Sequence, residues 1–156
     1  MLWTTLTFGK HRSKTSPEII LDDPDWFLWI LPELYDPLAV EAKDLARKAR
    51  AIKIPKRNSE KWPVEYRWEE GDRFCEFSSV KASIPEYSKW STRLPYLDLS
   101  WLRRRKAYDK RGNQNLIRDF RHHYFRDRNL TKKRCEAFFE NAENFIDAHR
   151  SIQAGS

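Results

Sequence analysis

Two acidic residues and a lysine stand in an order that could hold a divalent metal ion. Asp25 follows Pro24, and Glu41 precedes Lys43 by two positions, which together give the order PD…ExK. Two carboxylates can bind Mg²⁺ for the hydrolysis of a phosphodiester. Metal-dependent nucleases with this motif carry its second half on a sheet strand, whereas Glu41 and Lys43 lie in a helical pattern here. A metal-dependent nuclease is therefore an alternative to the main prediction.

Histidines and cysteines suggest no stronger chemistry. His122 and His123 are adjacent, so on a helix their side chains point about 100° apart. No paired Cys or His motif completes a zinc site with Cys135. Cys75 and Cys135 are the only cysteines, and two distant thiols favour a reduced compartment over a disulfide scaffold. We predict two buried thiols, no metal, no cofactor and no catalytic residues.

Lysine and arginine dominate the last third of the chain. The net charge is +7, and residues 99–134 hold thirteen Lys or Arg against three Asp, while residues 1–98 are balanced. An uncompensated basic segment favours a polyanionic partner, and interleaved aromatics could stack on unpaired bases. The candidate phosphate contacts are Arg103, Arg104, Arg105, Lys106, Lys110, Arg111, Arg118 and Arg121.

A second basic group lies near the N-terminus, in GKHRSK at residues 9–14. Its candidate contacts are Lys10, His11, Arg12 and Lys14. These residues occupy a loop that runs into a predicted helix, and a helix N-terminus favours an anion through its free N–H groups and dipole. We therefore predict that a phosphate binds this loop as well.

The same N-terminal stretch resembles the exodeoxyribonuclease X-like C-terminal domain, over about residues 5–35 only. The matching positions are Phe8, Gly9, Lys10, His11, Arg12, Lys14, Thr15, Asp23, Pro24, Trp26 and Trp29. The resemblance implies a nucleic-acid-associated module of DNA-processing proteins, without the exonuclease core. Ser13 stands where the pattern usually carries Gly, so the shape of the loop would differ if that Gly takes a positive φ.

Apolar spacing predicts the elements that position these residues. Helices are expected over 17–22, 24–31, 38–52, 97–108, 114–126 and 131–149, and strands over 2–8, 64–69 and 73–80. Ser16 and Asp23 are the expected N-caps of the first two helices, each followed by Pro. Phe8, Trp26 and Trp29 are expected in the core.

We predict an α+β protein: a small antiparallel sheet of two or three strands packed against five or six helices. Residues 1–150 would form a single domain, with the N-terminal module over about 2–35 and the basic helical region over about 97–149. Residues 151–156 would be a disordered tail, ending in a Gly-Ser of the kind left by cloning.

The predicted function is non-catalytic, non-specific binding of DNA or RNA. An adaptor that binds an acidic protein partner is a further alternative, because basic helices also bind acidic proteins. The longest apolar run is far shorter than the roughly 20 residues that a membrane helix needs, which predicts a cytoplasmic protein with no membrane partner. The oligomeric state is left open.

Overall fold

The computed structural model describes residues 2–54, 62–86, 89–106 and 108–146. Its elements in chain order are α1 (Ser16–Asp22), α2 (Pro24–Ile30), η1 (Leu31–Glu33), α3 (Leu38–Ala49), β1 (Val64–Glu69), β2 (Arg73–Ser79), β3 (Ser91–Leu94), α4 (Trp101–Arg105), α5 (Lys110–Phe125), α6 (Lys132–Glu140) and η2 (Ala142–Asn144). Six α-helices and a three-stranded antiparallel sheet confirm the predicted α+β class. The predicted tail, 151–156, lies outside the described residues.

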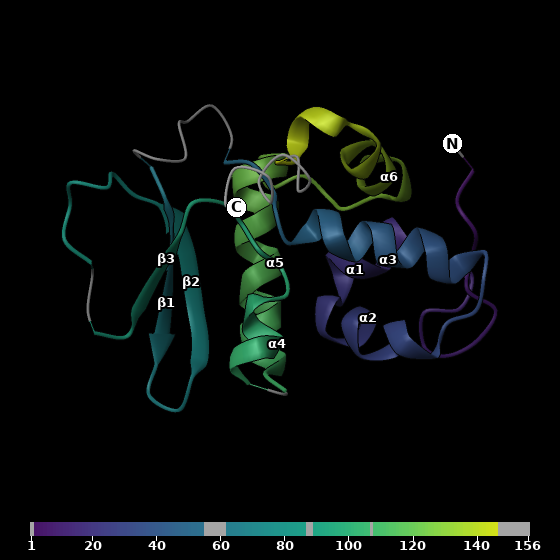
Figure 1. The fold of residues 1–156 in the computed structure, drawn as a ribbon, viewed down its shortest axis with the longest axis horizontal. Helices are drawn as coiled ribbons and strands as arrows, with labels where there is room; N and C mark the ends of the chain where they lie inside the picture. Colours follow the sequence, from purple (N-terminus) through teal and green to yellow (C-terminus); the bar gives the residue numbers. More distant parts are fainter. Residues whose placement is uncertain (1, 55–61, 87–88, 107, 147–156) are drawn as a thin grey trace, which may run out of the picture.

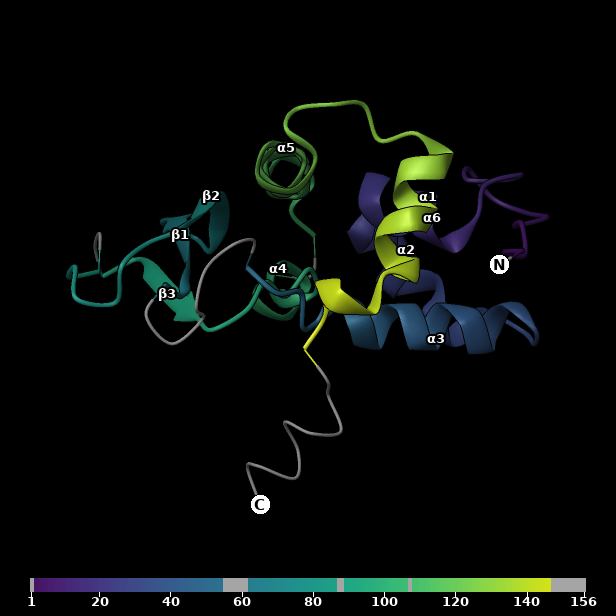
Figure 2. The same cartoon turned by 90° about the horizontal axis from the view of Figure 1, so that it is seen from above.

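Helix α5 stands between the sheet and the other helices (Figure 1). From above it is seen end-on, with the sheet on one side and α1, α2, α3 and α6 on the other (Figure 2). The short helix α4 also lies between the sheet and α3 in that view. These two helices therefore join the two halves of the fold. In the described part of the chain, no helix combines the length and apolar character needed to cross a bilayer.

The sheet has the strand order β2-β1-β3. Val64, Tyr66 and Trp68 alternate along β1 and are buried, which confirms the predicted hairpin strand. The outer edge of β2 is covered by side chains of α5: the Phe77 N–H donates to Asp119 Oδ2 at 3.0 Å. An edge strand whose N–H groups are bonded in this way does not recruit another strand.

The third strand is not the predicted one. Ser91–Leu94 pairs with β1, whereas the residues over 2–8 form no strand of the sheet. That segment turns back on its own loop, since the Leu6 N–H donates to the Lys14 carbonyl at 2.9 Å and Thr5 bridges Thr15. Leu6 is buried but Leu2 is 98% exposed. The apolar alternation over 2–8 therefore does not correspond to the buried face of a strand, and Leu6 instead holds this segment to the core.

Two basic-region helices are shorter than predicted. Leu97 pairs with Ile52 in an extended bridge, so the helix predicted from residue 97 begins only at Trp101. Helix α6 ends at Glu140, because Asn141 is extended and its side chain accepts from the Glu143 N–H to start η2. The residues beyond 146 of that predicted helix lie outside the described part.

The first helix is capped one residue earlier than predicted. Thr15 rather than Ser16 is the N-cap of α1, and its N–H donates to Glu18 Oε1 at 3.1 Å. Asp23 caps α2 as predicted, accepting from the Trp26 N–H. Both helices keep a Pro within their first two positions, where its missing N–H costs nothing.

Candidate nucleic-acid interface

Each arginine of α4 is bound to an aspartate from a different part of the fold. The three pairs are Arg103–Asp25, Arg104–Asp98 and Arg105–Asp72. They tie α4 to helix α2, to the turn before α4 and to the β1–β2 hairpin, respectively. Each of these three charges is therefore offset within the protein. The main role of the arginines at 103–105 is to hold α4 against the rest of the fold.

Two of these arginines also lie over tryptophan rings. The Arg104 guanidinium is 4.6 Å from the centre of the Trp101 ring, and that of Arg105 is 4.5 Å from the Trp68 ring. Stacking on a ring and pairing with a carboxylate hold each guanidinium in one orientation and offset its charge, which weakens its attraction for a phosphate.

The basic residues of the N-terminal loop differ in burial. His11 is only 6% exposed; its Nε2 lies 3.0 Å from Asp23 Oδ2, and its ring meets the edge of Trp26 at 4.8 Å between centres. His11 therefore packs inside the loop, which leaves little of its surface for contact with a phosphate. Arg12 is exposed and has no ion pair within the part of the chain that the structure describes.

Lys10 and Lys14 are exposed but lie beside carboxylates. Lys10 Nζ is 2.8 Å from Asp23 Oδ2, and Lys14 Nζ is 3.8 Å from Asp22 Oδ2. The hydrogen bond that Lys10 donates to Asp23 raises the pKa of Lys10 above its ordinary value. Burial opposes ionisation of Asp23, but bonds from Lys10 and His11 outweigh it and lower the pKa of that carboxyl. The charged forms of both partners are thus favoured near neutral pH.

Ser13 takes a left-handed backbone conformation, with φ of 72°. This is the conformation that Gly adopts without steric cost. We expect Ser13→Gly to raise the free energy of unfolding by about 0.5–1 kcal/mol, measured by urea denaturation. Gly9→Ala is the opposed control: Gly9 has φ of 76°, and an added Cβ would lie 3.2 Å from Trp26 Cζ2, so that variant loses stability. If Ser13→Gly lowered the free energy of unfolding as Gly9→Ala does, the backbone at Ser13 would not be strained.

The basic residues of α5, and those of the segment between α4 and α5, differ in whether they form ion pairs. Arg118 binds Asp119 at 2.9 Å and the Cys75 carbonyl at 3.3 Å, and Arg121 is half-buried with an Nε that has no hydrogen-bond partner. Three others, Lys106, Lys110 and Arg111, have no ion pair among the described residues. They lie together in sequence between the end of α4 and the first turn of α5.

One cleft brings the two basic regions together. It has a volume of about 700 Å³. Its lining is Lys10, Asp22, Asp23, Asp25, Trp26, Trp29, Arg103, Tyr108, Lys110, Asn113 and Gln114. The N-terminal loop and α2 form part of its wall, and α4 with the start of α5 form another, in agreement with the position of α2 beside α4 in Figure 1. Lys10 and Lys110 thus share one site although they lie far apart in sequence.

Two exposed aromatic rings line the cleft: Trp29, which was predicted to lie in the core, and Tyr108, one of the aromatics interleaved with the basic segment. Trp29 is 57% exposed and Tyr108 is 65% exposed. The prediction that Phe8 and Trp29 lie in the core was wrong, since Phe8 is 42% exposed as well. Phe27 and Ile30, not Trp29, form the buried face of α2. The sequence did carry a signal for this exposure. Helix α2 is short and contains more aromatic residues than one buried face can hold.

Comparison of the chain with known proteins supplied no function. No family model matches the chain. Curated proteins and solved structures gave no match either. The chemistry of the cleft and of the cations around it is therefore the basis for assigning a function.

The residues of the possible nuclease motif are separated. Asp25 lines the large cleft and is bound by Arg103, whereas Glu41 lines another pocket and accepts from the Thr4 N–H at 2.9 Å. No group of three or more His, Cys, Asp or Glu in the described part of the chain is arranged to hold a metal ion. Nuclease activity remains a hypothesis, tested by Mg²⁺-dependent degradation that is lost on changing Asp25 or Glu41.

The thiols and the histidines of α5 also lie in different surroundings. Cys135 is buried as predicted, whereas Cys75 is only partly buried. Burial raises the pKa of Cys75 to about 11 and that of Cys135 to about 12. His122 Nδ1 lies 3.1 Å from Asp127 Oδ2, and His123 packs on the Phe77 ring. These contacts are structural, and both thiols stay protonated near neutral pH.

Proposed function

We propose that this protein binds DNA or RNA without cleaving it. The observation that carries the proposal is the group Lys106, Lys110 and Arg111, whose charges are not offset by ion pairs in the described residues and of which Lys110 lines the cleft. Cations of this kind supply the phosphate contacts of sequence-independent binding. Lys10 adds a cation of the N-terminal loop to the lining of the same cleft, and Arg12 is a further exposed cation of that loop.

The charge of the whole chain supports the same proposal. A net charge of +7 attracts a polyanion over a distance of about a Debye length, roughly 8 Å at physiological salt. The resemblance of residues 5–35 to a module of DNA-processing proteins points in the same direction. The internal pairing of Arg103, Arg104 and Arg105 moves the proposed contact from the middle of α4 to its C-terminal side.

Reversal of two cations at the start of α5 tests the proposal. We expect Lys110→Glu with Arg111→Glu to weaken binding of labelled oligonucleotides at least 10-fold at about 50 mM salt, and to lower the slope of log K against log [salt] by about 1.5–2. Fluorescence anisotropy at several salt concentrations measures both quantities. The folded state should be retained, because acidic residues in the first turn complement the helix dipole.

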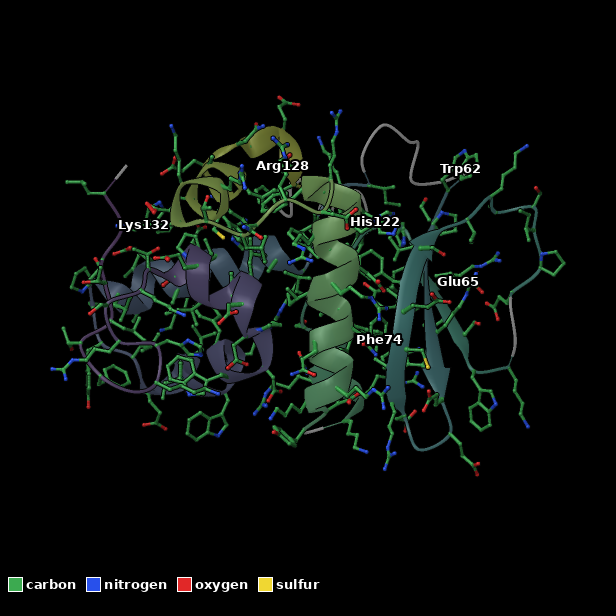
Figure 3. All side chains as sticks on the ribbon, turned by 180° about the vertical axis from the view of Figure 1, so that it is seen from behind. Trp62, Glu65, Phe74, His122, Arg128 and Lys132 are labelled. Carbon is green, nitrogen blue, oxygen red and sulfur yellow. The ribbon has the colours of Figure 1, made fainter. Side chains whose placement is uncertain are left out.

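The matched control reverses Lys132 and Lys133. These residues also begin a helix, are also exposed, and change the net charge equally. Figure 3 places Lys132 away from the α5 end at which Lys110 lies, and Arg128 and His122 near the other end of α5. A smaller loss in this control locates the contact, while equal losses would indicate attraction by net charge alone. Absence of oligonucleotide binding at low salt would overturn the proposal and favour an acidic protein partner.

A further inference from the structure

The cleft presents aromatic faces from two separate parts of the chain. Trp29 belongs to α2, and Tyr108 belongs to the connection between α4 and α5. Both line the cleft, and both rings are more than half exposed. Large aromatics left this accessible beside a cavity have no packing role that requires them, and flat rings offer a surface on which a nucleobase can stack.

The carboxylates of the cleft do not make it an anionic site. Asp23 is bound by Lys10 and His11, and Asp25 is bound by Arg103. Asp22 has Lys14 at 3.8 Å. With these three acids offset, Lys110 adds a positive charge that no ion pair in the described residues balances. The Lys10 side chain is 60% exposed, and its ammonium carries three donors, of which Asp23 uses one. The cleft can therefore accept a phosphate beside its aromatic rings.

Amide side chains complete the lining. Gln114 is exposed, and its side chain makes no hydrogen bond within the described part of the chain. Asn113 Nδ2 donates to the Asp109 carbonyl, which leaves the side-chain oxygen of Asn113 as an acceptor. An amide supplies both donors and acceptors to the edge of a base. A volume of about 700 Å³ also falls in the range of sites that enclose a small ligand, roughly 300–1,000 Å³.

We infer that the cleft takes an unpaired base of single-stranded nucleic acid, stacked on Trp29 and Tyr108 with its phosphate at Lys110 and Lys10. This inference rests on the proposed function and makes it specific. A duplex cannot place a base in the cleft, because its bases are stacked and paired inside the helix. Duplex binding therefore uses only the phosphate contacts, and single-strand binding uses the rings as well.

Substitution of the two rings tests the inference on the full chain. We expect Trp29→Ala and Tyr108→Ala each to weaken binding of a labelled oligo(dT) or oligo(U) of roughly 15 nucleotides about 5-fold to 100-fold, as loss of a stacked base does. Affinity for a duplex of the same length should change less than 2-fold, as no base is stacked there. Trp29→Phe should restore most single-strand affinity, because it keeps a flat ring.

Matched controls separate stacking from general loss of aromatic surface. Tyr35→Ala removes a tyrosine that is 87% exposed, and Trp90→Ala a tryptophan that is 41% exposed; neither lines the cleft. Both should leave single-strand affinity unchanged. If Trp29→Ala and Tyr108→Ala bind single strands as the unchanged protein does, the inference is overturned while the proposed function stands. If no oligonucleotide, single or double, binds at low salt, the proposed function fails and the inference fails with it.

Discussion

Asp109→Ala is expected to lower the free energy of unfolding by about 2–4 kcal/mol. Asp109 is only 9% exposed and serves two elements at once. Its Oδ1 accepts from the Gly112 N–H at 2.8 Å, which caps α5, and its Oδ2 accepts from the Phe74 N–H at 2.9 Å on the edge of β2. Alanine leaves both N–H groups without a partner where water has little access. Urea denaturation followed by circular dichroism measures the loss.

Two further variants divide this effect between helix and sheet. Asp109→Ser keeps an oxygen for the cap but is too short to reach Phe74, so about half of the loss should return. Gly112→Ala is expected to destabilise the same site, because an added Cβ would lie 2.1 Å from Asp109 Oδ2. The double variant Asp109→Ala with Gly112→Ala should lose less than the sum of the single losses, since the clash partner is gone. Additive losses would show that the two residues act independently.

Asp98→Ala is the second change with a large expected effect, again about 2–4 kcal/mol of unfolding free energy. This carboxylate is 2% exposed and accepts from the Ser100 N–H at 2.8 Å, from the Ser100 hydroxyl at 2.6 Å and from the Arg104 guanidinium. The backbone of the same residue exchanges hydrogen bonds with the buried Tyr66 hydroxyl. Loss of the carboxylate therefore loosens the turn that leads into α4.

The partner arginine provides the control for this prediction. Arg104→Gln leaves the Asp98 carboxylate, which is 2% exposed, without its ion pair but with both of its hydrogen bonds from Ser100. We therefore expect Arg104→Gln to lower the unfolding free energy by less than Asp98→Ala, which removes all three interactions. Thermal melts of both variants check this asymmetry. Equal losses would mean that the ion pair, not the buried hydrogen bonds of Asp98, stabilises the turn.

The burial of Asp98 also affects how binding measurements on Arg104 variants are interpreted. Reversal of Arg104 to Glu places a second carboxylate beside buried Asp98 and lowers stability through repulsion. A drop in oligonucleotide affinity in that variant would then mix unfolding with lost contact. Lys110 and Arg111 lack such partners in the described residues, so their reversal reports on binding alone.

Local sequence patterns predicted most element types of this fold. The apolar spacing over 38–52 became α3, with Leu45 and Ala46 buried and Ile52 buried just beyond it. The alternation over 64–69 became β1, and Gly71 with φ of 86° forms the predicted turn. These features depend on residues within a few positions of one another, and periodicity records that directly.

The candidate site was predicted less completely, because its state depends on contacts between distant residues. Charge counting identified Lys10, Lys110 and Arg103 as cations, but it could not pair Arg103 with Asp25, which lies 78 positions away. It also could not show that His11 is buried against Trp26, or that Trp29 is exposed. A side chain's periodicity says which face of a helix it occupies, but only packing decides whether that face is covered.

The sequence by itself therefore determined the α+β class, the two basic regions, the Asp23 cap of α2 and the hairpin turn at Gly71. Tertiary structure decided which cations remain available, because each ion pair needs a carboxylate brought within about 4 Å by the fold. It also decided that the N-terminal loop and the start of α5 line one cleft. Charge and helical pattern are properties of short segments, whereas a binding surface is what remains after distant segments have packed and paired.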